Sequence, residues 1–572
     1  MVPTAVRSTV ENWLSPPEIT RRWSQAAHTA PGAAIFARFL EHMGVEWSCD
    51  ATDFAHIPCT GPVVVVANHP FGLAEGPVLG SLLTEIRPDV KFLANSRLTG
   101  LPGLEPFFIP VNPFGKAAQS NGRALRRSIE WLRQGGLLVT FPSGEVASLQ
   151  LPQLQIAEPR WNENIARIIR MTGARAVPIF FEGFNGPGFH IAGLIHPSLR
   201  TALLPRELLN KRGHTLRVAI GRPIAADTLQ HLGTDREAMN YLHQRTVLLR
   251  SRTKKPASFV WAPPRARVAG PVDPQALRRE AESLPPESIL LESADYRVSV
   301  ASAAQIPDTL REIGRLREIA FRNAGEGTGR SLDLDRFDPH YQHLWVSHRE
   351  TAEVAGAYRL VGTDAVDAPH QLYTSTLFRF RPGLLESLHP ALELGRSFVR
   401  PERQKSYQSL LLLWKGIGRY VARHPRYKTL FGPVSISREY SAASRSLMVS
   451  YLESSCTRPE LAGRVQPRRQ FRHQFGNARL NGADAALLAP LLRNLEELSE
   501  VVADMEADGK GVPVLLRQYL QLGGAVLAFN VDRAFSSVVD GLVVVDLTRL
   551  APPHLEKYLG REGAAAFRAY HA

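Results

Sequence analysis

The chain has 572 residues, which is too long for one ordinary hydrophobic core, so two domains of roughly 250 to 300 residues are expected. Its 44% hydrophobic and 21% charged residues indicate a globular protein, and its net charge of +14 favours an anionic partner: nucleic acid, an acidic carrier protein or an anionic lipid surface. The three scattered cysteines exclude a disulfide framework or a cysteine metal site and fit a reducing cytoplasm.

The first residues lack an apolar stretch of signal-peptide length, and no apolar run approaches the ~20 residues needed to span a bilayer. Any membrane contact is therefore expected to be peripheral. Residues 18–47 show an amphipathic pattern in which Trp23, Phe36 and Leu40 are apolar and Arg22 and Arg38 are basic. Two interpretations remain open: a helix lying on a membrane surface, or a helix that covers the sheet that follows, which is the more common meaning of such a stripe.

The stretch from residue 63 to residue 76 contains a candidate general base. The valines at 63–66 form a short β-branched run closed by turn formers, which predicts a buried strand that delivers His69 to its end. A histidine can take a proton from a hydroxyl, and a carboxylate such as Glu75 can hold its ring in the required tautomer. The structural alternative, a histidine at a strand end and an acidic helix start, is the more common one for His69 alone.

A second motif, residues 141–145, follows another apolar strand. It predicts a tight turn whose backbone NH groups can point at a headgroup or an oxyanion. Its position after the histidine motif favours a functional role over a purely structural one. The motif consists of Phe141, Pro142, Ser143, Gly144 and Glu145.

Strands and helices alternate between residues 63 and 222, which predicts an α/β layer fold. A helix at 122–133 ends at Gly135 and Gly136 as at a C-cap. The predicted strands are 63–67, 91–93, 107–111, 137–141 and 176–180.

Several of these blocks resemble, in order, those of the glycerolipid acyltransferases: residues 69–75, 91–95, 108–111, 141–145 and 177–179. Five residues separate His69 from Glu75, where the family's commonest form has four residues and then Asp. The Asn-His-Pro-Phe-Gly motif with this longer gap resembles that of the branch that acylates lyso-ornithine lipid and of related hemolysin-like proteins. The resemblance implies that His69 and Glu75 are catalytic. It also implies that Asn68 and the 141–145 block bind substrate.

Residues 253–290 are rich in proline and predict a linker without a regular core. The expected domains are therefore 1–252 and 291–572. The second opens with a predicted helix at 307–322 and a glycine-rich stretch at 325–338. No strand precedes these glycines and no Lys-Ser/Thr follows them, which argues against a P-loop; the aspartates lack the glycine and glutamate of an EF-hand, so no metal site is expected.

Two predicted strands in the second domain carry charged residues. Arg359 lies on the strand at 354–360, and Glu393 and Arg396 lie on the strand at 392–399. The spacing of three puts these last two side chains on opposite faces unless a bulge intervenes, and Gly395 is where such a bulge can form.

The order of Arg317, Phe321, Asp335, Asp338, Arg359, Glu393 and Arg396 resembles the pattern of acyl-homoserine-lactone synthases. The wider stretch 296–440, including 326–329 and 430–437, resembles the ornithine N-acyltransferases more closely. Both families are variants of the GNAT fold that take acyl groups from acyl carrier protein. The resemblance implies a GNAT-like α/β domain in which Glu393 is the base that deprotonates an acceptor amine. The implied binding residues are Arg317, Asp335, Asp338, Arg359 and Arg396.

Arg400 and Arg403 lie where GNAT enzymes bind the pyrophosphate of the donor. The usual glycine-rich signature is absent, which fits acyl carrier protein better than coenzyme A as the donor. A solvated basic turn is the alternative. No cofactor beyond the donor substrate is expected.

The sequence thus predicts a bifunctional, peripherally membrane-bound cytoplasmic acyltransferase, with amide formation on ornithine in the second domain and O-acylation of the resulting lyso-lipid in the first. One alternative is a lysophospholipid acyltransferase with an accessory GNAT-like domain. Another is a non-enzymatic, hemolysin-like membrane-binding protein. Nucleic acid is not an expected partner, because no helix-turn-helix, zinc finger or RNP pattern accompanies the charge.

Overall fold

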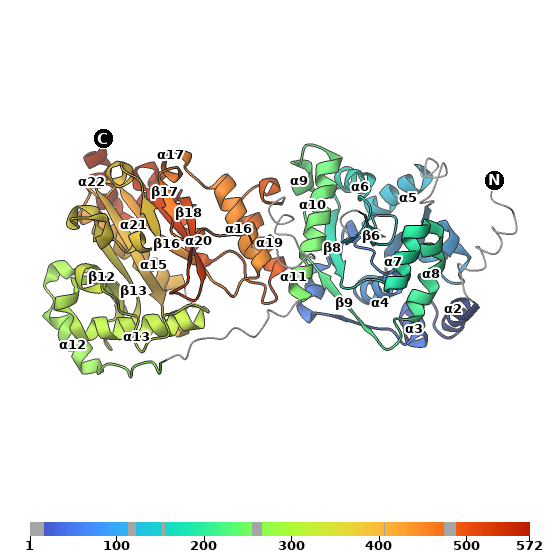
Figure 1. The fold of residues 1–572 in the computed structure, drawn as a ribbon, viewed down its shortest axis with the longest axis horizontal. Coiled ribbons are helices and arrows are strands. Elements are labelled where there is room, and N and C mark those ends of the chain that lie inside the picture. Colours follow the sequence, from blue (N-terminus) through green and yellow to red (C-terminus); the bar gives the residue numbers. More distant parts are fainter. Residues whose placement is uncertain (1–16, 112–121, 152–154, 254–265, 405–406, 474–487) are drawn as a thin grey trace. The chain divides into compact units, whose positions relative to one another are not determined.

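The computed structural model describes residues 17–111, 122–151, 155–253, 266–404, 407–473 and 488–572 (Figure 1). The chain divides into two compact units. Met1–Pro256 and Phe475–Gly511 make up the N-terminal unit, and Ala257–Gln474 and Val512–Ala572 make up the C-terminal unit. Each unit has one large sheet flanked by helices, so the predicted α/β fold class is confirmed.

The N-terminal unit is built on a seven-stranded sheet. Its order is β1 (Glu46–Cys49), β9 (Thr215–Ile220), β8 (Arg175–Phe181), β2 (Val63–Ala67), β5 (Leu137–Thr140), β3 (Val90–Asn95) and β4 (Phe108–Val111). Strand β2 is parallel to both of its neighbours, β5 and β8, and all its residues are buried, which explains its run of valines. The carboxyl ends of β2 and β5 therefore meet at one edge of the sheet.

Helices α2 (Pro17–Thr29) and α3 (Ala34–Met43) contain the amphipathic stretch at 18–47. Their apolar residues are buried: Trp23, Phe36 and Phe39 pack on one another, and Phe36 contacts Phe92 of β3. Helix α3 also packs on α4 (Glu75–Ile86). The interpretation that this stretch covers the sheet is therefore confirmed, and the interfacial one is wrong.

The remaining elements of the first part of the chain surround this sheet (Figure 1). They are α5 (Gly122–Arg133), the hairpin β6 (Ser148–Gln150) and β7 (Gln155–Ala157), α6 (Asn164–Thr172), α7 (Pro187–Ile195), α8 (Pro197–Leu209), α9 (Ala226–Gln230), α10 (Asp235–Leu248) and α11 (Arg250–Thr253).

Helix α19 (Leu495–Met505) also belongs to the N-terminal unit, although it comes late in the chain. The buried Arg245 of α10 donates to Asp504 at 2.8 Å, and Tyr241 donates to Glu497. The predicted domain of 291–572 is therefore interrupted, because α19 packs with the first unit. Nothing in the local pattern of this segment indicates which core it joins.

The predicted linker at 253–290 is partly folded. Residues 254–265 lie outside the described ranges, but Pro274–Ser283 form helix α12, which Asp273 caps and Pro274 opens. Glu280 accepts hydrogen bonds from the backbone NH groups of Asp308 and Thr309 at the start of α13 (Pro307–Asn323). The prediction of an unstructured linker was wrong for residues 274–283, because Pro274 begins a helix instead of breaking one.

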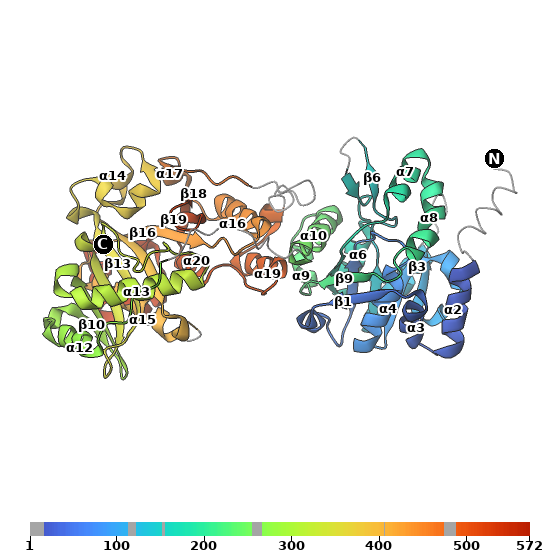
Figure 2. The same cartoon turned by 60° about the horizontal axis from the view of Figure 1, so that its bottom comes forward.

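The C-terminal unit has an eight-stranded sheet (Figure 2). Its order is β10 (Ile289–Glu292), β11 (Tyr296–Ser302), β12 (Gln342–His348), β13 (Val354–Gly362), β15 (Ala391–Val399), β16 (Thr429–Ile436), β19 (Val538–Asp546) and β18 (Ala525–Asp532). Neighbouring strands are antiparallel except β15 and β16, which pair in parallel only where Ala391–Glu393 face Thr429–Phe431. Beyond this short ladder the two strands separate, and we call this opening the strand split.

Helix α13 packs on β13 and β15, and α15 (Tyr407–Arg423) packs on β11, β12 and β13. Trp345 of β12 lies in the cluster under α13, whereas the adjacent Leu344 lies beside Gly416 of α15, so the two helices cover opposite faces. Smaller elements complete the unit: β14 (Phe378–Phe380), α14 (Leu384–Leu388), α16 (Ala442–Ser455), α17 (Pro459–Ala462), β17 (Val465–Pro467), α20 (Val514–Gln521), α21 (Pro552–Leu559) and α22 (Arg561–His571). Among the residues that the structure describes, no helix is both long and apolar enough to cross a bilayer.

Candidate active sites

His69 and Glu75 meet at the carboxyl end of β2. Glu75 is the first residue of α4, its side chain is fully buried, and its carboxylate accepts hydrogen bonds from the backbone NH groups of Phe71 (2.6 Å) and Gly72 (2.9 and 3.0 Å). The Nδ1 atom of His69 lies 3.3 Å from Oε1 of Glu75, without the alignment of a regular hydrogen bond. The imidazole is 16% exposed, so a substrate can reach its other nitrogen.

The electrostatics of this pair suit a general base held in one orientation. Burial lowers the pKa of His69, but the charges of Glu75 and Glu158 outweigh burial and raise this pKa above its usual value. Burial raises the pKa of Glu75, but His69 and the backbone NH groups of Phe71 and Gly72 outweigh it and hold this pKa below its usual range. Glu75 thus stays ionised and faces Nδ1, which leaves Nε2 for chemistry.

The 141–145 motif lies directly beside His69. The ring of Phe141 stacks on the imidazole with 4.5 Å between centroids, and the backbone NH of Ala147 donates to the carbonyl of His69 at 2.9 Å. Gly144 has a φ of 65°, which its turn requires, and Glu145 pairs with Arg200 of α8 at 2.7 Å. Pro142 and Ser143 complete the turn, and the hydroxyl of Ser143 donates to the carbonyl of Glu145.

Glu158 is a residue of this site that the sequence did not indicate. Its carboxylate accepts a hydrogen bond from the backbone NH of His69 and another from Trp161 at 2.7 Å. Burial raises the pKa of Glu158 despite these bonds. No motif marks this residue, because its role depends on the fold that brings it to His69.

Asn68, expected to bind substrate, is used by the sheet. Its Nδ2 donates to the carbonyl of Phe181 at 3.0 Å, and its Oδ1 accepts from the backbone NH of Phe181 at 2.6 Å. These two bonds tie the end of β2 to the end of β8. The contacts of Asn68 therefore support a role in positioning His69, and substrate binding by this side chain stays a prediction.

In the C-terminal unit the five predicted binding residues come together in one buried network. Arg317 of α13 donates to Asp338 (2.9 Å) and to Asp333 (3.2 Å), and Arg359 of β13 donates to Asp335 (2.7 Å) and Asp338 (3.2 Å). Burial raises the pKa of Asp338, but Arg317 and Arg359 outweigh it and hold this pKa well below its usual range. The aspartates of 333–338 therefore neutralise arginines.

Arg396 lies at the edge of this network, where β15 bulges. Arg359 pairs with Gly395 and Ala357 with Phe398, so β15 carries one extra residue, and Arg396 has a φ of 48°. The predicted bulge is confirmed, one residue after Gly395. The guanidinium of Arg396 lies 3.5 Å from Asp333 and 3.6 Å from Asp335, and over the rings of Tyr373 and Phe535.

Glu393, the predicted base, is fully enclosed. Its carboxylate accepts hydrogen bonds from the hydroxyls of Tyr341 and Thr374 and from the backbone NH groups of Tyr373 (3.1 Å) and Thr374 (2.7 Å). Burial raises the pKa of Glu393 despite the hydrogen bonds from Thr374 and Tyr341. Because four donors occupy both oxygens, these contacts support a positioning role, and catalysis by Glu393 stays a prediction.

Three carboxylates at the strand split form what we call the acidic cluster: Glu326, Asp532 and Asp540. Burial raises the pKa of Glu326 to about 7, although Ser435 donates to it at 2.9 Å and Arg396 lies near. Burial, Asp532 and Glu326 raise the pKa of Asp540 well above its usual value, and Arg396 opposes them. Asp540 of β19 is opposite Ser435 of β16. Ser435 lies on the part of β16 that is no longer paired with β15.

The acidic cluster was not predicted as a site from the sequence. Glu326 stands in the glycine-rich stretch, between Gly325 and Gly327, which both have positive φ. A single glutamate among these glycines was the sequence signal that could have pointed to it. Asp540 and Asp532 come from strands that pair only in the fold. A buried acid with a pKa near 7 can act as a general base at neutral pH.

Arg400 and Arg403 both face Glu353. Arg400 pairs with Glu353 and with Glu402 (3.1 Å), and Arg403 pairs with Glu353 (3.1 Å) and donates to Tyr296. The side chains of Arg400 and Arg403 are 21% and 33% exposed. Donor binding by these arginines stays a prediction.

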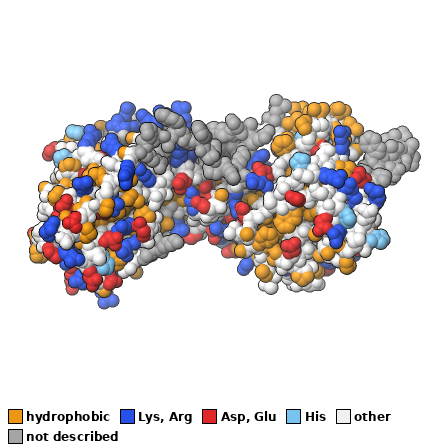
Figure 3. Space-filling view, turned by 90° about the horizontal axis from the view of Figure 1, so that it is seen from below, with side chains coloured by type: hydrophobic (Ala, Val, Ile, Leu, Met, Phe, Trp, Pro, Cys, Tyr) orange, Lys and Arg blue, Asp and Glu red, His pale blue; other side chains and the backbone are white. Residues whose placement is uncertain are grey.

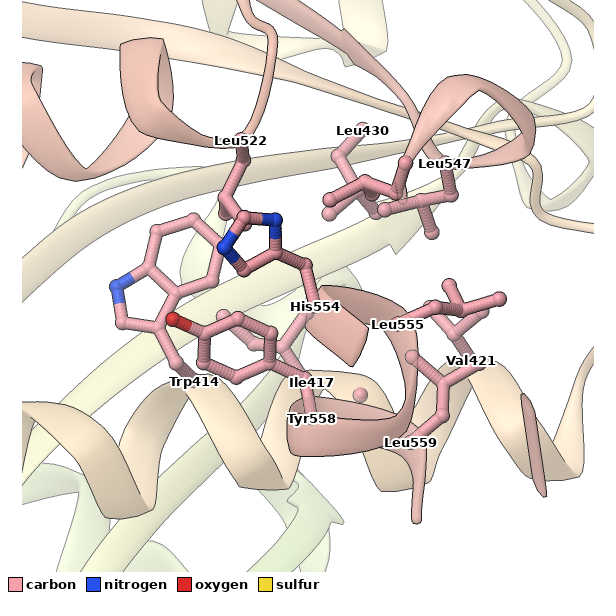
Figure 4. Close-up of a pocket in the computed structure, with 12 residues that line it drawn as sticks. Trp414, Ile417, Val421, Leu430, Leu522, Leu547, His554, Leu555, Tyr558 and Leu559 are labelled. Carbon is pink, nitrogen blue, oxygen red and sulfur yellow. The ribbon is translucent and has the colours of Figure 1, made fainter. Parts of the chain in front are cut away.

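A cavity of about 20 Å³ lies between α15 and α21, lined by apolar side chains that include Trp414, Ile417 and Leu555 (Figure 4). This volume holds about one water molecule, so the cavity is too small for an acyl chain. Within the described ranges, no group of three or more His, Cys, Asp and Glu side chains could hold a metal ion.

Comparison with known proteins assigns a family to part of each unit. Residues 24–255 match the family described as Acyltransferase, and residues 316–415 match the Acetyltransferase (GNAT) domain. The first match spans the His69 site, and the second includes Arg317, Arg359, Glu393 and Arg396.

Among three relatives of this chain, two are named as N-acyltransferases and one as an O-acyltransferase. A Glycine N(alpha)-acyltransferase of Bacteroides thetaiotaomicron is 36% identical over 30% of this chain and 56% of its own length. An L-ornithine N(alpha)-acyltransferase of Rhodobacter capsulatus is 29% identical over 46% of this chain and 95% of its own length. A Lyso-glycine lipid O-acyltransferase of Phocaeicola vulgatus is 28% identical over 31% of this chain and 65% of its own length.

The match spans about half the length of the glycine N-acyltransferase relatives. The family matches fall in the order in which the two units begin along the chain. The chain therefore contains an acyltransferase domain followed by a GNAT domain.

Proposed function

We propose that the protein makes a two-chain amino-acid lipid in two steps: the C-terminal unit forms an amide on the α-amine of ornithine, and the N-terminal unit esterifies a hydroxyl of the acyl chain so attached. The observation that carries this proposal is the His69–Glu75 pair, 3.3 Å apart beside the 141–145 turn, in the same chain as a GNAT domain. The two reactions need one acceptor hydroxyl and one acceptor amine, which suits two separate sites.

In the ester-forming step, Nε2 of His69 takes the proton of the acceptor hydroxyl while the oxygen attacks the carbonyl of an acyl thioester. The C–S bond then breaks, and the imidazolium returns the proton to the thiolate that leaves. Glu75 holds Nδ1 and stabilises the imidazolium that forms, because its carboxylate is buried and ionised. Phe141 covers one face of the ring and limits its rotation. The NH of Gly144 donates to the carbonyl of Phe141 at 3.0 Å, so the donors for the oxyanion or a headgroup would be the NH groups of Ser143 and Glu145.

In the amide-forming step, the negative charges of the acidic cluster favour an amino acid with a cationic side chain as the acceptor. Within the described part of the chain, neither Asp540 nor Asp532 forms an ion pair with Lys or Arg, and Arg396 faces Asp333 and Asp335. An ammonium group on the acceptor's side chain would pair with these two carboxylates. Glu326, with a pKa of about 7, is the base that takes the proton of the α-ammonium. The free amine then attacks the carbonyl of the acyl thioester, the C–S bond breaks, and the thiolate that leaves takes up the second proton of the nitrogen. This argument favours ornithine over glycine, the acceptor in the names of the more identical relatives.

Acyl carrier protein is the proposed donor for both steps, and the inner face of the cell membrane the proposed location. The net charge of +14 supports an acidic carrier and an anionic surface. Screening by salt should weaken both contacts.

The experiment is a lipid analysis of cells that express the full chain, extended to purified protein supplied with acyl carrier protein and either ornithine or glycine. We expect a new phosphorus-free, ninhydrin-positive lipid and a preference for ornithine in vitro. Altered phospholipid acylation without the new lipid would support a lysophospholipid acyltransferase instead. A preference for glycine would overturn the role given to the acidic cluster.

A further inference from the structure

One face of the N-terminal unit is apolar and exposed. Helices α7 and α8 and the hairpin β6–β7 contribute to it, and Figure 3 shows the hydrophobic side chains gathered at the upper edge of this unit. We call it the α7–α8 face. Its exposed side chains are Leu151 (60%), Ile156 (37%), Ile191 (58%), Leu194 (45%), Ile195 (74%) and Leu199 (44%).

The sequence of this face lacks the charged residues that are frequent in the rest of the chain. Residues 183–199 contain no Asp, Glu, Lys or Arg. Positions 191, 194 and 195 follow helical spacing on α7, and Leu199 lies in the first turn of α8, after the extended residue His196. Burial elsewhere in the unit accounts for the other amphipathic helices, α2 and α3. An exposed apolar face of this kind marks a surface that meets another apolar phase.

The face adjoins the His69 site. Glu145 of the 141–145 turn pairs with Arg200 of α8, and Asn185, just before α7, donates to the carbonyl of Phe71 at 3.1 Å. A Cβ atom at Gly72 would lie 2.6 Å from Leu204 of α8, so this helix packs directly on the turn that follows His69. A molecule seated on the α7–α8 face is therefore held next to the candidate base.

The charges that border the face select the kind of partner. Between residues 183 and 213 the chain has four basic side chains, Arg200, Arg206, Lys211 and Arg212, and one acid, Glu207. All four follow the apolar segment in the sequence. Arg206 and Arg212 are exposed, whereas Arg200 pairs with Glu145 and Lys211 donates to the carbonyl of Phe184. Exposed cations beside an apolar helix are the arrangement of a helix that lies in a membrane interface beside anionic headgroups. An acidic carrier protein would instead need cations on the face itself.

We infer that the α7–α8 face docks on the surface of an anionic lipid bilayer, with Ile191, Leu194, Ile195 and Leu199 inserted below the headgroups. The bilayer then delivers the lyso-lipid acceptor to His69 without its full transfer into water. This inference rests on the proposed function for the identity of the acceptor, whereas binding to the bilayer does not depend on turnover.

The test measures sedimentation of the full-length protein with sucrose-loaded vesicles of phosphatidylcholine and phosphatidylglycerol. The Ile195→Glu, Leu199→Glu double variant should lose roughly tenfold or more in vesicle partition, because burying one large aliphatic side chain is enough for a factor of that size. Met171→Glu is the matched control, since Met171 is 54% exposed on α6, outside the face, and it should bind as the wild type does.

Two further measurements separate the outcomes. Turnover of a short-chain lyso acceptor dissolved as monomers should be unchanged in the double variant, and Ile195→Ser with Leu199→Ser replaces it if the charged variant does not fold. Unchanged vesicle binding of the variant, or a dimer in light scattering that the variant dissociates, would overturn the inference. Absence of any turnover by a wild type that binds vesicles would instead contradict the proposed function.

Discussion

The two candidate sites use buried charge in opposite ways. In the N-terminal unit one carboxylate, Glu75, faces one histidine, whose ring is 16% exposed, so the pair ends in a group that can react. In the C-terminal unit Arg317, Arg359 and Arg396 face Asp333, Asp335 and Asp338, and their charges are largely satisfied by one another. The reactive groups there are the carboxylates just beyond this network.

The difference shows that a cluster of charged residues in a motif does not by itself identify chemistry. Transferring an ion into the interior is costly unless a partner and hydrogen bonds neutralise it. A fully paired set therefore stabilises a fold, whereas a group left with a raised pKa and one free atom is a candidate for proton transfer. His69 and Glu326 meet this second description.

The largest expected effect tests the reactive pair of the N-terminal unit, His69 and Glu75. His69→Ala should lower ester formation by roughly 10²- to 10⁴-fold, because it removes the base that takes the hydroxyl proton. Amide formation should continue, so cells should accumulate the mono-acylated intermediate, which mass spectrometry of lipid extracts measures. His214→Ala, at an exposed histidine of the same unit, is the control. Normal levels of the di-acylated lipid in a folded His69→Ala protein would exclude His69 from the mechanism.

The next effect tests the paired arginine–aspartate network of the C-terminal unit. Arg359→Met should lower the free energy of unfolding of the C-terminal unit by about 3–5 kcal/mol, because it leaves Asp335 and Asp338 buried without their partner. Urea denaturation followed by tryptophan fluorescence measures the loss. Arg330→Met, at an exposed arginine, should change it little. A folded variant with unchanged stability and no amide formation would show instead that Arg359 serves the reaction.

A third pair of variants decides which glutamate is the base. Glu326→Gln should lower amide formation roughly 10²-fold at neutral pH with little change in stability. In the wild type the rate should rise with pH through about 7, since burial raises the pKa of Glu326 to about 7 and the base acts when ionised. This rise should disappear in Glu326→Gln.

Glu393→Gln provides the contrast. It should lower the free energy of unfolding by about 1–3 kcal/mol, because an amide NH₂ replaces an acceptor that faces Tyr341 and Thr374. Its pH profile should keep the rise near neutrality. If Glu393→Gln loses that rise and Glu326→Gln keeps it, Glu393 is the base, as the family resemblance implied.

The smallest effect concerns Glu75. Glu75→Gln should slow ester formation by roughly tenfold, since the amide still positions the ring but no longer stabilises the imidazolium. Burial, which lowers the pKa of His69, then acts without the opposing charge of Glu75, so the acid limb of the pH–rate profile should move to lower pH. An acid limb that stays in place in this variant would mean that Glu75 does not face the titrating group.

Much of the architecture could be predicted from local patterns. The valine run at 63–66 predicted β2, the glycines at 135–136 predicted the end of α5, and the spacing of Glu393 and Arg396 predicted a bulge, because strand burial, helix termination and side-chain alternation depend on neighbouring residues. His69, Glu75 and the 141–145 block were found for a similar reason, since each motif directly follows a strand.

By itself, the sequence determined the α/β class, the two acyltransferase-like regions and the residues on which a base could stand. Only the tertiary structure decided that α19 belongs with the first unit, that Glu393 is enclosed by four donors while Glu326 is not, and that α2 and α3 are buried while α7 and α8 are exposed. The physical reason is that burial and charge pairing depend on contacts between residues far apart in the chain. A helix with an apolar stripe has the same local pattern whether a sheet or a membrane covers it.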